Sequence, residues 1–188
     1  MAVTPAMLYS VSDKKFTEEN IGTQGFFLYD HTLLYGTGHY GITPRFGTYN
    51  LKTRQRHILG DGHIESLSPN KKNVLISRDP NRSYFYKELI VFDIEEQSEK
   101  RIGTGRDACF WGDSKVVFFV HPSRNKMYAY SLESNTTEEV ELPGTILTTP
   151  TIAPGDRGIL LRLESPNDND RSGTIYLLND DGIAKLTQ

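Results

Sequence analysis

A pattern that returns about every 42 residues is the feature of this sequence that most restricts its fold. Each copy is an apolar run of strand length that leads into a polar turn and a second short run. The copies are marked by Tyr9, Tyr49, Phe92, Tyr130 and Leu178, at intervals of 40, 43, 38 and 48 residues. A repeat of this length is typical of one four-stranded blade of a β-propeller.

A second set of anchors keeps the same spacing independently. Tyr29, Pro69, Gly112 and Pro154 each precede a run of β-branched or aromatic residues, at intervals of 40, 43 and 42 residues. Long stretches with a helical apolar period are absent from the sequence, so we expect an all-β protein with almost no helix. The two sets together predict consecutive blades.

The repeat divides the chain into four full blades and a further half. We expect a single β-propeller domain over residues 1–188, with an N-terminal half-blade at 6–22 and full repeats at 25–60, 61–103, 104–143 and 144–188. Five blades, one of them thin, is the favoured arrangement. The alternatives are a four-bladed ring plus an N-terminal hairpin, and an open arc closed by dimerisation. Between the second and third full repeats we expect an outer strand at Glu99–Ile102, a loop at 103–107 and an inner strand ending at Trp111.

The turn between the first two strands of the later repeats resembles that of TolB-like and WD40-like propeller repeats. The usual form in that family is an apolar or aromatic residue followed by Ser-Pro-Asp-Gly-Lys. The residues that carry the resemblance are Leu67-Ser68-Pro69-Asn70-Lys71-Lys72, Phe110-Trp111-Gly112-Asp113-Ser114-Lys115 and Ile152-Ala153-Pro154-Gly155-Asp156-Arg157. The first full repeat departs from this form at Tyr29-Asp30-His31-Thr32. The resemblance covers roughly residues 25–188 and implies the fold, because such short motifs specify no activity.

Composition and charge argue against several classes of protein. The net charge is −3, and Lys and Arg are scattered among Asp and Glu, so we expect no binding of nucleic acid. The longest apolar runs, such as residues 116–120, are far shorter than the roughly 20 residues of a membrane helix. The N-terminus lacks the pattern of a secretory signal, and the single cysteine, Cys109, fits a reducing compartment. These features predict a soluble cytoplasmic protein that binds no membrane.

One face of the predicted propeller is the candidate binding surface, since loops between the second and third strands and between blades converge there. The aromatic run Tyr84-Phe85-Tyr86, flanked by cations, is typical of an interface hot spot. In the competing interpretation, Phe85 extends the third strand and packs inward. The candidate binding residues on this face are Arg78, Arg82, Tyr84, Tyr86, Arg106 and Arg124. We predict a non-catalytic binding or assembly module for a protein partner or a small ligand such as a sugar.

The main alternative is a small propeller lyase or hydrolase with a site at the mouth of the channel. Its candidate catalytic residues are His39, His63, His121, Asp79 and Asp107. The histidines lack the close spacing that metal sites often show, so we predict neither metal nor cofactor. Asp30, Asp79, Asp107 and Asp168 fall on different repeats and could form the carboxylate pair of a glycosidase.

Three further features have simpler interpretations. Residues 36–41 match G-x-G-x-x-G, but a strand rather than a helix is expected next, which favours a turn over a nucleotide site. Cys109 lies beside Phe110 and Trp111 and is expected to be a small buried hydrophobe rather than a nucleophile. The unmatched N-terminal strands could drive self-association, as in a homodimer, by adding to a sheet edge.

Overall fold

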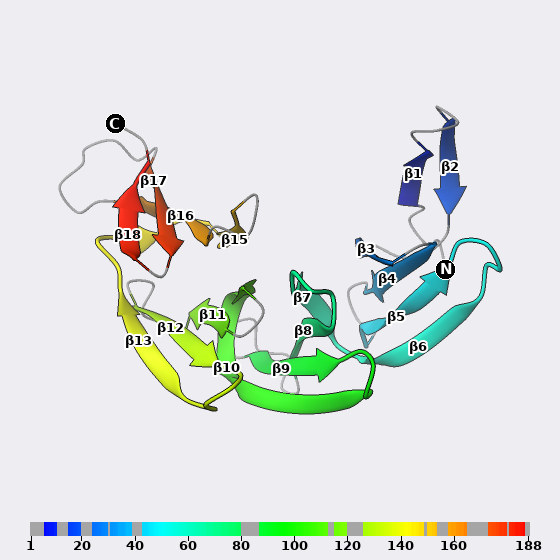
Figure 1. The fold of residues 1–188 in the computed structure, drawn as a ribbon, viewed down its shortest axis with the longest axis horizontal. Coiled ribbons are helices and arrows are strands. Elements are labelled where there is room, and N and C mark those ends of the chain that lie inside the picture. The colour runs from blue at the N-terminus through cyan, green and yellow to red at the C-terminus, as the bar shows by residue number, and fades with distance from the viewer. Residues whose placement is uncertain are drawn as a thin grey trace. The chain divides into compact units, whose positions relative to one another are not determined.

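The computed structural model describes residues 6–10, 15–19, 24–29, 31–38, 43–79, 87–112, 115–119, 126–148, 150–153, 158–164, 173–179 and 181–186. In these residues every regular element is a strand, as the all-β prediction requires (Figure 1). The chain forms two compact units, residues 1–64 and 65–188. The number of blades stays a prediction.

The first unit contains a two-stranded sheet and a four-stranded sheet, both antiparallel. Strands β1 (Ala6–Ser10) and β2 (Lys15–Glu19) form the hairpin that the sequence places in the N-terminal half-blade. The four-stranded sheet runs in chain order through β3 (Gln24–Tyr29), β4 (Thr32–Thr37), β5 (Arg45–Asn50) and β6 (Arg56–Asp61). Gly36 and Thr37, which open the G-x-G-x-x-G match, belong to β4, and the next described element is β5, so no described helix follows the motif.

The second unit is built around a seven-stranded sheet in chain order. Its strands are β7 (His63–Leu67), which begins at the end of the first unit, β8 (Asn73–Arg78), β9 (Lys87–Asp93), β10 (Ser98–Trp111), β11 (Lys115–Phe119), β12 (Lys126–Ser131) and β13 (Thr137–Glu141). A further sheet contains β14 (Thr145–Ile146), β15 (Thr151–Ile152), β16 (Ile159–Glu164), β17 (Thr174–Asn179) and β18 (Gly182–Lys185).

The expectation of a loop at residues 103–107 was wrong, because these residues belong to strand β10. It is one strand of 14 residues that serves as the outer strand of β7–β10 and as the inner strand of β10–β13. Residues 103–105 stay extended because β9 begins early enough to pair with them, with Gly105 opposite Lys87. The strand changes partners at two irregularities, one between Arg101 and Gly103 and one between Arg106 and Cys109. Such bulges bend a strand and increase its twist without ending it.

The turn that carries the family resemblance is held by its own side chains. The Ser68 hydroxyl accepts a hydrogen bond from the Asn73 amide at 2.9 Å and donates one to Asn70 Oδ1 at 2.8 Å. Asn70 Oδ1 also accepts from the Lys72 amide, and the Lys71 amide donates to the Ser68 carbonyl. Lys71 has φ 62°, the left-handed conformation in which glycine is usual, and glycine occupies this place in the family form.

The first set of sequence anchors marks a second recurrent turn. Each of Tyr49, Phe92 and Tyr130 is followed by a residue with a short polar side chain, and four residues later the chain has positive φ, at Arg54, Gln97 and Asn135. In the first two turns an Asn50 or Asp93 side-chain oxygen accepts hydrogen bonds from the amides two and three residues on. The repeat detected in the sequence is therefore a repeat of local turn chemistry.

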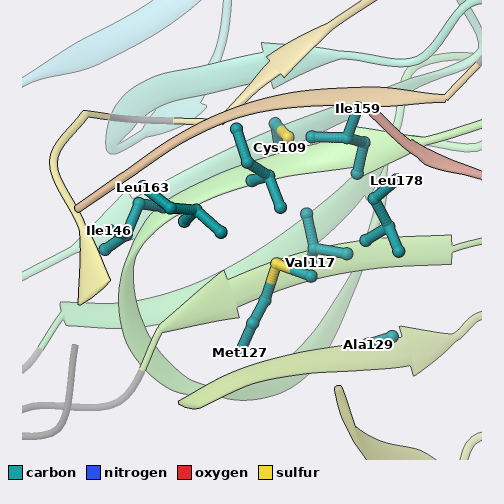
Figure 2. Close-up of a cluster of buried hydrophobic side chains, with 9 residues drawn as sticks. Cys109, Val117, Met127, Ala129, Ile146, Ile159, Leu163 and Leu178 are labelled. Atoms are coloured by element: carbon teal, nitrogen blue, oxygen red, sulfur yellow. The ribbon is translucent and has the colours of Figure 1, made fainter. Parts of the chain in front are cut away.

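The core of the second unit lies between successive groups of strands. One cluster joins β8–β10 to the next blade and includes Leu75, Val91, Phe110, Val116 and Phe118. A second cluster joins that blade to the last sheet through Cys109, Val117, Met127, Ala129, Ile146, Ile159, Leu161, Leu163 and Leu178 (Figure 2). Neighbouring residues of β11 enter different clusters because successive side chains of a strand point to opposite faces. The near-continuous apolar runs in the sequence follow from this two-sided burial.

Candidate functional site

The candidate site lies where β8 ends, β9 begins and β10 passes from one blade to the next. Arg78 pairs with Glu88, and Lys87 pairs with Gly105, so these three strands bring their polar residues to a common edge. We call this the polar edge and define it by Glu65, Ser77, Arg78, Asp79, Lys87, Arg106 and Asp107. It contains four residues that the sequence singled out, namely Arg78, Asp79, Arg106 and Asp107.

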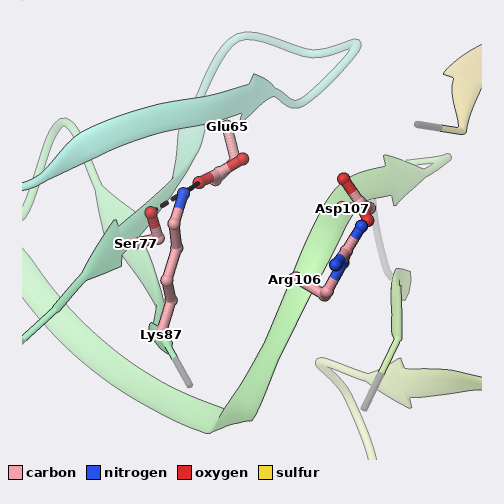
Figure 3. A network of polar contacts seen from close by, with 5 residues as sticks. All are labelled: Glu65, Ser77, Lys87, Arg106 and Asp107. Carbon is pink, nitrogen blue, oxygen red and sulfur yellow. Dashed lines mark hydrogen bonds and ion pairs between the residues drawn. The ribbon is translucent and has the colours of Figure 1, made fainter. Parts of the chain in front are cut away.

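A half-buried carboxylate lies at the centre of the polar edge. Glu65 Oε1 on β7 accepts a hydrogen bond from Ser77 Oγ at 2.5 Å and forms an ion pair with Lys87 Nζ at 3.2 Å (Figure 3). The Ser77 hydroxyl is fully buried, and the Glu65 side chain is 18% exposed. Because a buried hydroxyl or charge is costly without a partner, the three groups stabilise one another.

Arg106 and Asp107 form the second part of the edge. Adjacent side chains of a regular strand point to opposite faces, yet Arg106 Nε lies 2.5 Å from Asp107 Oδ2 (Figure 3). Asp107 has φ 50°, and the pairing of β10 with β11 is irregular between Arg106 and Cys109. The left-handed backbone turns the carboxylate back to the neighbouring guanidinium. Bulges and unusual backbone of this kind are common beside functional sites.

Arg78 is held by a carboxylate on β10. Its Nη1 donates a hydrogen bond to Glu99 Oε2 at 2.7 Å, and its Nη2 pairs with Glu99 Oε1. The hydrogen bond from Arg78 is the main reason why the pKa of Glu99 is lowered from its ordinary value. Beside this pair, Arg101 Nε lies 2.9 Å from Glu88 Oε1. Cations and carboxylates therefore alternate across the outer strands of this blade.

The remaining candidates divide into described and undescribed residues. His63 is exposed at the start of β7, where its ring lies close to Gly38. Six of the candidates lie outside the described residues: His39, His121, Arg82, Tyr84, Tyr86 and Arg124. The competing packing role of Phe85 lies outside them too, as do Asp30 and Asp168 of the glycosidase interpretation. In the part of the chain that the structure describes, no three His, Cys, Asp or Glu side chains are grouped so as to hold a metal ion.

Cys109 is buried in the core, as its apolar neighbours predict. Burial raises the pKa of its thiol to about 12. Because the thiolate is the reactive form, the native protein presents no activated nucleophile at this position.

Two residues of the polar edge were missed by sequence reasoning. Glu65 occupies a position in β7 between the buried residues Ile64 and Ser66, and Ser77 ends the apolar run of β8. The available signal was a carboxylate in the inner strand of a blade, where apolar residues are usual.

The described residues include no helix long and apolar enough to cross a membrane.

Comparison with known proteins finds solved structures with a similar fold. No protein-family model matches the sequence, and no curated protein matches it either. Among solved structures, TolB from Acinetobacter baumannii is similar with a TM-score of 0.69 and 14% identity, over 97% of this chain and 48% of TolB. An oligogalacturonate lyase in complex with manganese has a TM-score of 0.68 and 14% identity, over 96% of this chain and 58% of the lyase.

The β-propeller domain of the trilobed protease from Pyrococcus furiosus is also similar, with a TM-score of 0.62 and 18% identity over 88% of this chain and 56% of that domain's chain. This chain thus spans about half the length of the proteins it resembles. The three neighbours carry different functions on one scaffold, so the likeness concerns the fold. It confirms the resemblance noted in the turn motifs: the chain has a TolB-like β-propeller architecture.

Proposed function

We propose that this protein is a non-catalytic binding or assembly module that contacts a protein partner through the polar edge and the adjoining residues 80–86. The observation that carries this proposal is the internal pairing of charge at the edge. Glu65 is paired with Lys87, Arg78 with Glu99, and Arg106 with Asp107. Charges held in place in this way form a fixed pattern that a complementary surface can match.

The pairing with Arg78 argues against general base catalysis by Glu99. A general base works best when its pKa lies near the working pH. Arg78 moves the pKa of Glu99 in the opposite direction, which keeps this carboxylate ionised and weakly basic. The predicted aromatic anchors, Tyr84 and Tyr86, would add apolar area beside the fixed charges. Buried aromatic anchors supply much of the binding energy in many interfaces.

The catalytic alternative rests on His39, His63 and His121. Two solved structures similar to this chain are an oligogalacturonate lyase with manganese and a protease propeller domain, so the scaffold is compatible with chemistry. Of the three histidines only His63 lies among the described residues, and its ring packs near Gly38.

The test compares partner capture by matched variants. Proteins retained by the wild type are identified and their affinities measured for the double variant Tyr84→Ala/Tyr86→Ala. The control is Ile175→Ala/Leu186→Ala, which removes exposed apolar area from the last sheet. We expect the first variant to lose about tenfold or more in affinity and the control to bind as the wild type does.

Two results would overturn this proposal. One is equal binding by both double variants. The other is cleavage of oligogalacturonate in the presence of manganese that His121→Ala abolishes while the folded state is retained.

A second candidate function is self-association through the N-terminal strands. It is favoured by the β1–β2 hairpin, which within the described residues pairs with no further strand. An unpaired strand edge can add to another sheet. Removal of residues 1–22 should then lower the mass in solution, measured by light scattering. An unchanged mass with an intact fold would exclude this function.

A further inference from the structure

The four-stranded sheet of the first unit includes a segment whose composition has an excess of positive charge. Residues 31–60 contain no Asp or Glu, although the whole chain has 24 acidic residues and a net charge of −3. The same segment contains Arg45, Lys52, Arg54 and Arg56, together with three histidines. The average composition of the chain conceals this local excess.

Three of the four cations lie at one end of the sheet. Arg45 is at the other end of β5, where its Nε lies 3.5 Å from Asp61 Oδ1. Lys52, Arg54 and Arg56 lie on the turn between β5 and β6 and on the first residue of β6, and all three are exposed. We call these three residues the basic turn. Exposed charges of one sign in a row create a local positive potential.

The basic turn has a well-defined backbone. Asn50 Oδ1 accepts hydrogen bonds from the amides of Lys52 and Thr53 at 2.9 and 3.0 Å, and the Arg54 amide donates to the Asn50 carbonyl at 2.8 Å. The guanidinium of Arg56 lies 5.9 Å from the ring centroids of both Tyr35 and Tyr49. A partner would therefore meet charges on an ordered turn, which reduces the entropy lost on binding.

A hollow of about 690 Å³ opens beside the basic turn. Neutral hydrogen-bonding side chains line much of it, and Tyr29, His57 and Arg56 of the basic turn complete the wall; the neutral residues are Thr32, Thr48, Asn50 and Gln55. Tyr29 is 63% exposed, which is unusual for a large aromatic side chain. The hollow thus combines amide and hydroxyl groups, one exposed ring and a cationic border.

We propose that this hollow and the basic turn bind an acidic, extended peptide segment of a partner protein. Charges spaced along a turn match carboxylates spaced along an extended chain better than one compact anion. The hydroxyl and amide groups can hydrogen-bond a peptide main chain, and Tyr29 offers apolar contact. Single-stranded nucleic acid is less suited, because it binds best to several large aromatic side chains, and the lining of the hollow includes one, Tyr29, beside the smaller imidazole of His57.

The experiment titrates the full chain with a fluorescein-labelled, glutamate-rich peptide of about ten residues, long enough to extend past the turn. Anisotropy should show saturable binding that weakens as ionic strength rises. The variant Lys52→Gln/Arg54→Gln should bind about five- to tenfold more weakly, because each exposed ion pair contributes up to about 1 kcal/mol. Tyr29→Ala should also weaken binding while leaving the charge unchanged.

The matched control is Lys71→Gln/Lys72→Gln on the turn after β7. It removes the same charge, and Lys71, with φ 62°, has nearly the same backbone as Arg54, with φ 58°. An equal loss in this control would show attraction to net charge alone and overturn the proposal. So would absence of saturable binding, equal binding of a glutamine-rich peptide, or tighter binding of an oligothymidylate. Salt-sensitive self-association abolished by Lys52→Gln/Arg54→Gln, without peptide binding, would identify a second copy as the occupant instead.

Discussion

The polar edge and the basic turn handle charge in opposite ways. At the polar edge, side chains that are about one-fifth to one-third exposed meet groups of opposite charge, as in Glu65 with Lys87 and Arg106 with Asp107. At the basic turn, Lys52, Arg54 and Arg56 are exposed and share one sign. Burial explains the difference, because a partly desolvated charge needs a partner and a solvated charge does not. The charges of the edge are therefore held within ion pairs, whereas those of the turn are exposed and share one sign.

The largest effect on stability should follow from Glu65→Ala. This change leaves the buried Ser77 hydroxyl and the half-buried Lys87 ammonium without their shared acceptor. We expect the free energy of unfolding in urea to fall by about 2 kcal/mol. Glu65→Gln, which keeps an oxygen for Ser77, should lose less. A loss below about 0.5 kcal/mol for Glu65→Ala would mean that pairing at the edge is not required.

At Asp107 the contribution of backbone conformation to stability can be distinguished from the contribution of charge. Asp107→Ala and Asp107→Gly both remove the partner of Arg106, but only glycine adopts φ 50° without strain. Asp107→Gly should therefore be more stable than Asp107→Ala by about 1 kcal/mol in the same unfolding assay. Equal stability of the two variants would show that the left-handed conformation costs little here.

The pair between Arg78 and Glu99 predicts a pH dependence. The folded-state pKa of Glu99 is lowered from 4.5, so its contribution is present above that pH and is lost as the pH falls through the lowered value. Because the pair is partly exposed, Arg78→Gln should cost only about 0.5 kcal/mol at neutral pH. Urea unfolding near pH 3 should show a smaller difference between the two proteins. A difference that does not change with pH would assign the effect to packing of the Arg78 chain.

The smallest effect is expected at the basic turn. Lys52→Gln/Arg54→Gln should change the free energy of unfolding by no more than about 0.5 kcal/mol. It should be slightly stabilising at low salt, because it removes repulsion between like charges. The gain should vanish at about 0.1 M salt, whereas the loss caused by Glu65→Ala should persist. A large destabilisation by the turn variant would mean that these cations are structural and would remove the contrast between the two regions.

Most of the strands could be predicted from the sequence, because turn chemistry and apolar runs are local. A sequence anchor is followed directly by a short polar residue in three turns, at Asn50, Asp93 and Ser131. In each turn the residue four positions after this polar residue has positive φ. One exception is β10, where a loop was expected at residues 103–107. The glycines and charges there are typical of a loop, and only pairing with β9 keeps the segment extended.

The candidate site was only partly predictable. Arg78, Asp79, Arg106 and Asp107 were expected on one loop face; in the structure the first two lie at the end of β8 and the other two lie in β10, and their role in binding stays a prediction. Glu65 and Ser77 were missed because their significance depends on a contact between residues 12 positions apart in sequence, on different strands. The basic turn was overlooked because charge was considered over the whole chain rather than by segment.

The repeat, the turns and the all-β class were determined by the sequence itself, since hydrogen bonds within a few residues and the alternation of side chains set them. The tertiary structure decided which charges became neutralised and which stayed exposed. Cross-strand pairing placed Lys87 beside Glu65, and the bulge in β10 turned Asp107 onto Arg106. Such partners are chosen by register and burial, and no spacing along the chain specifies either one.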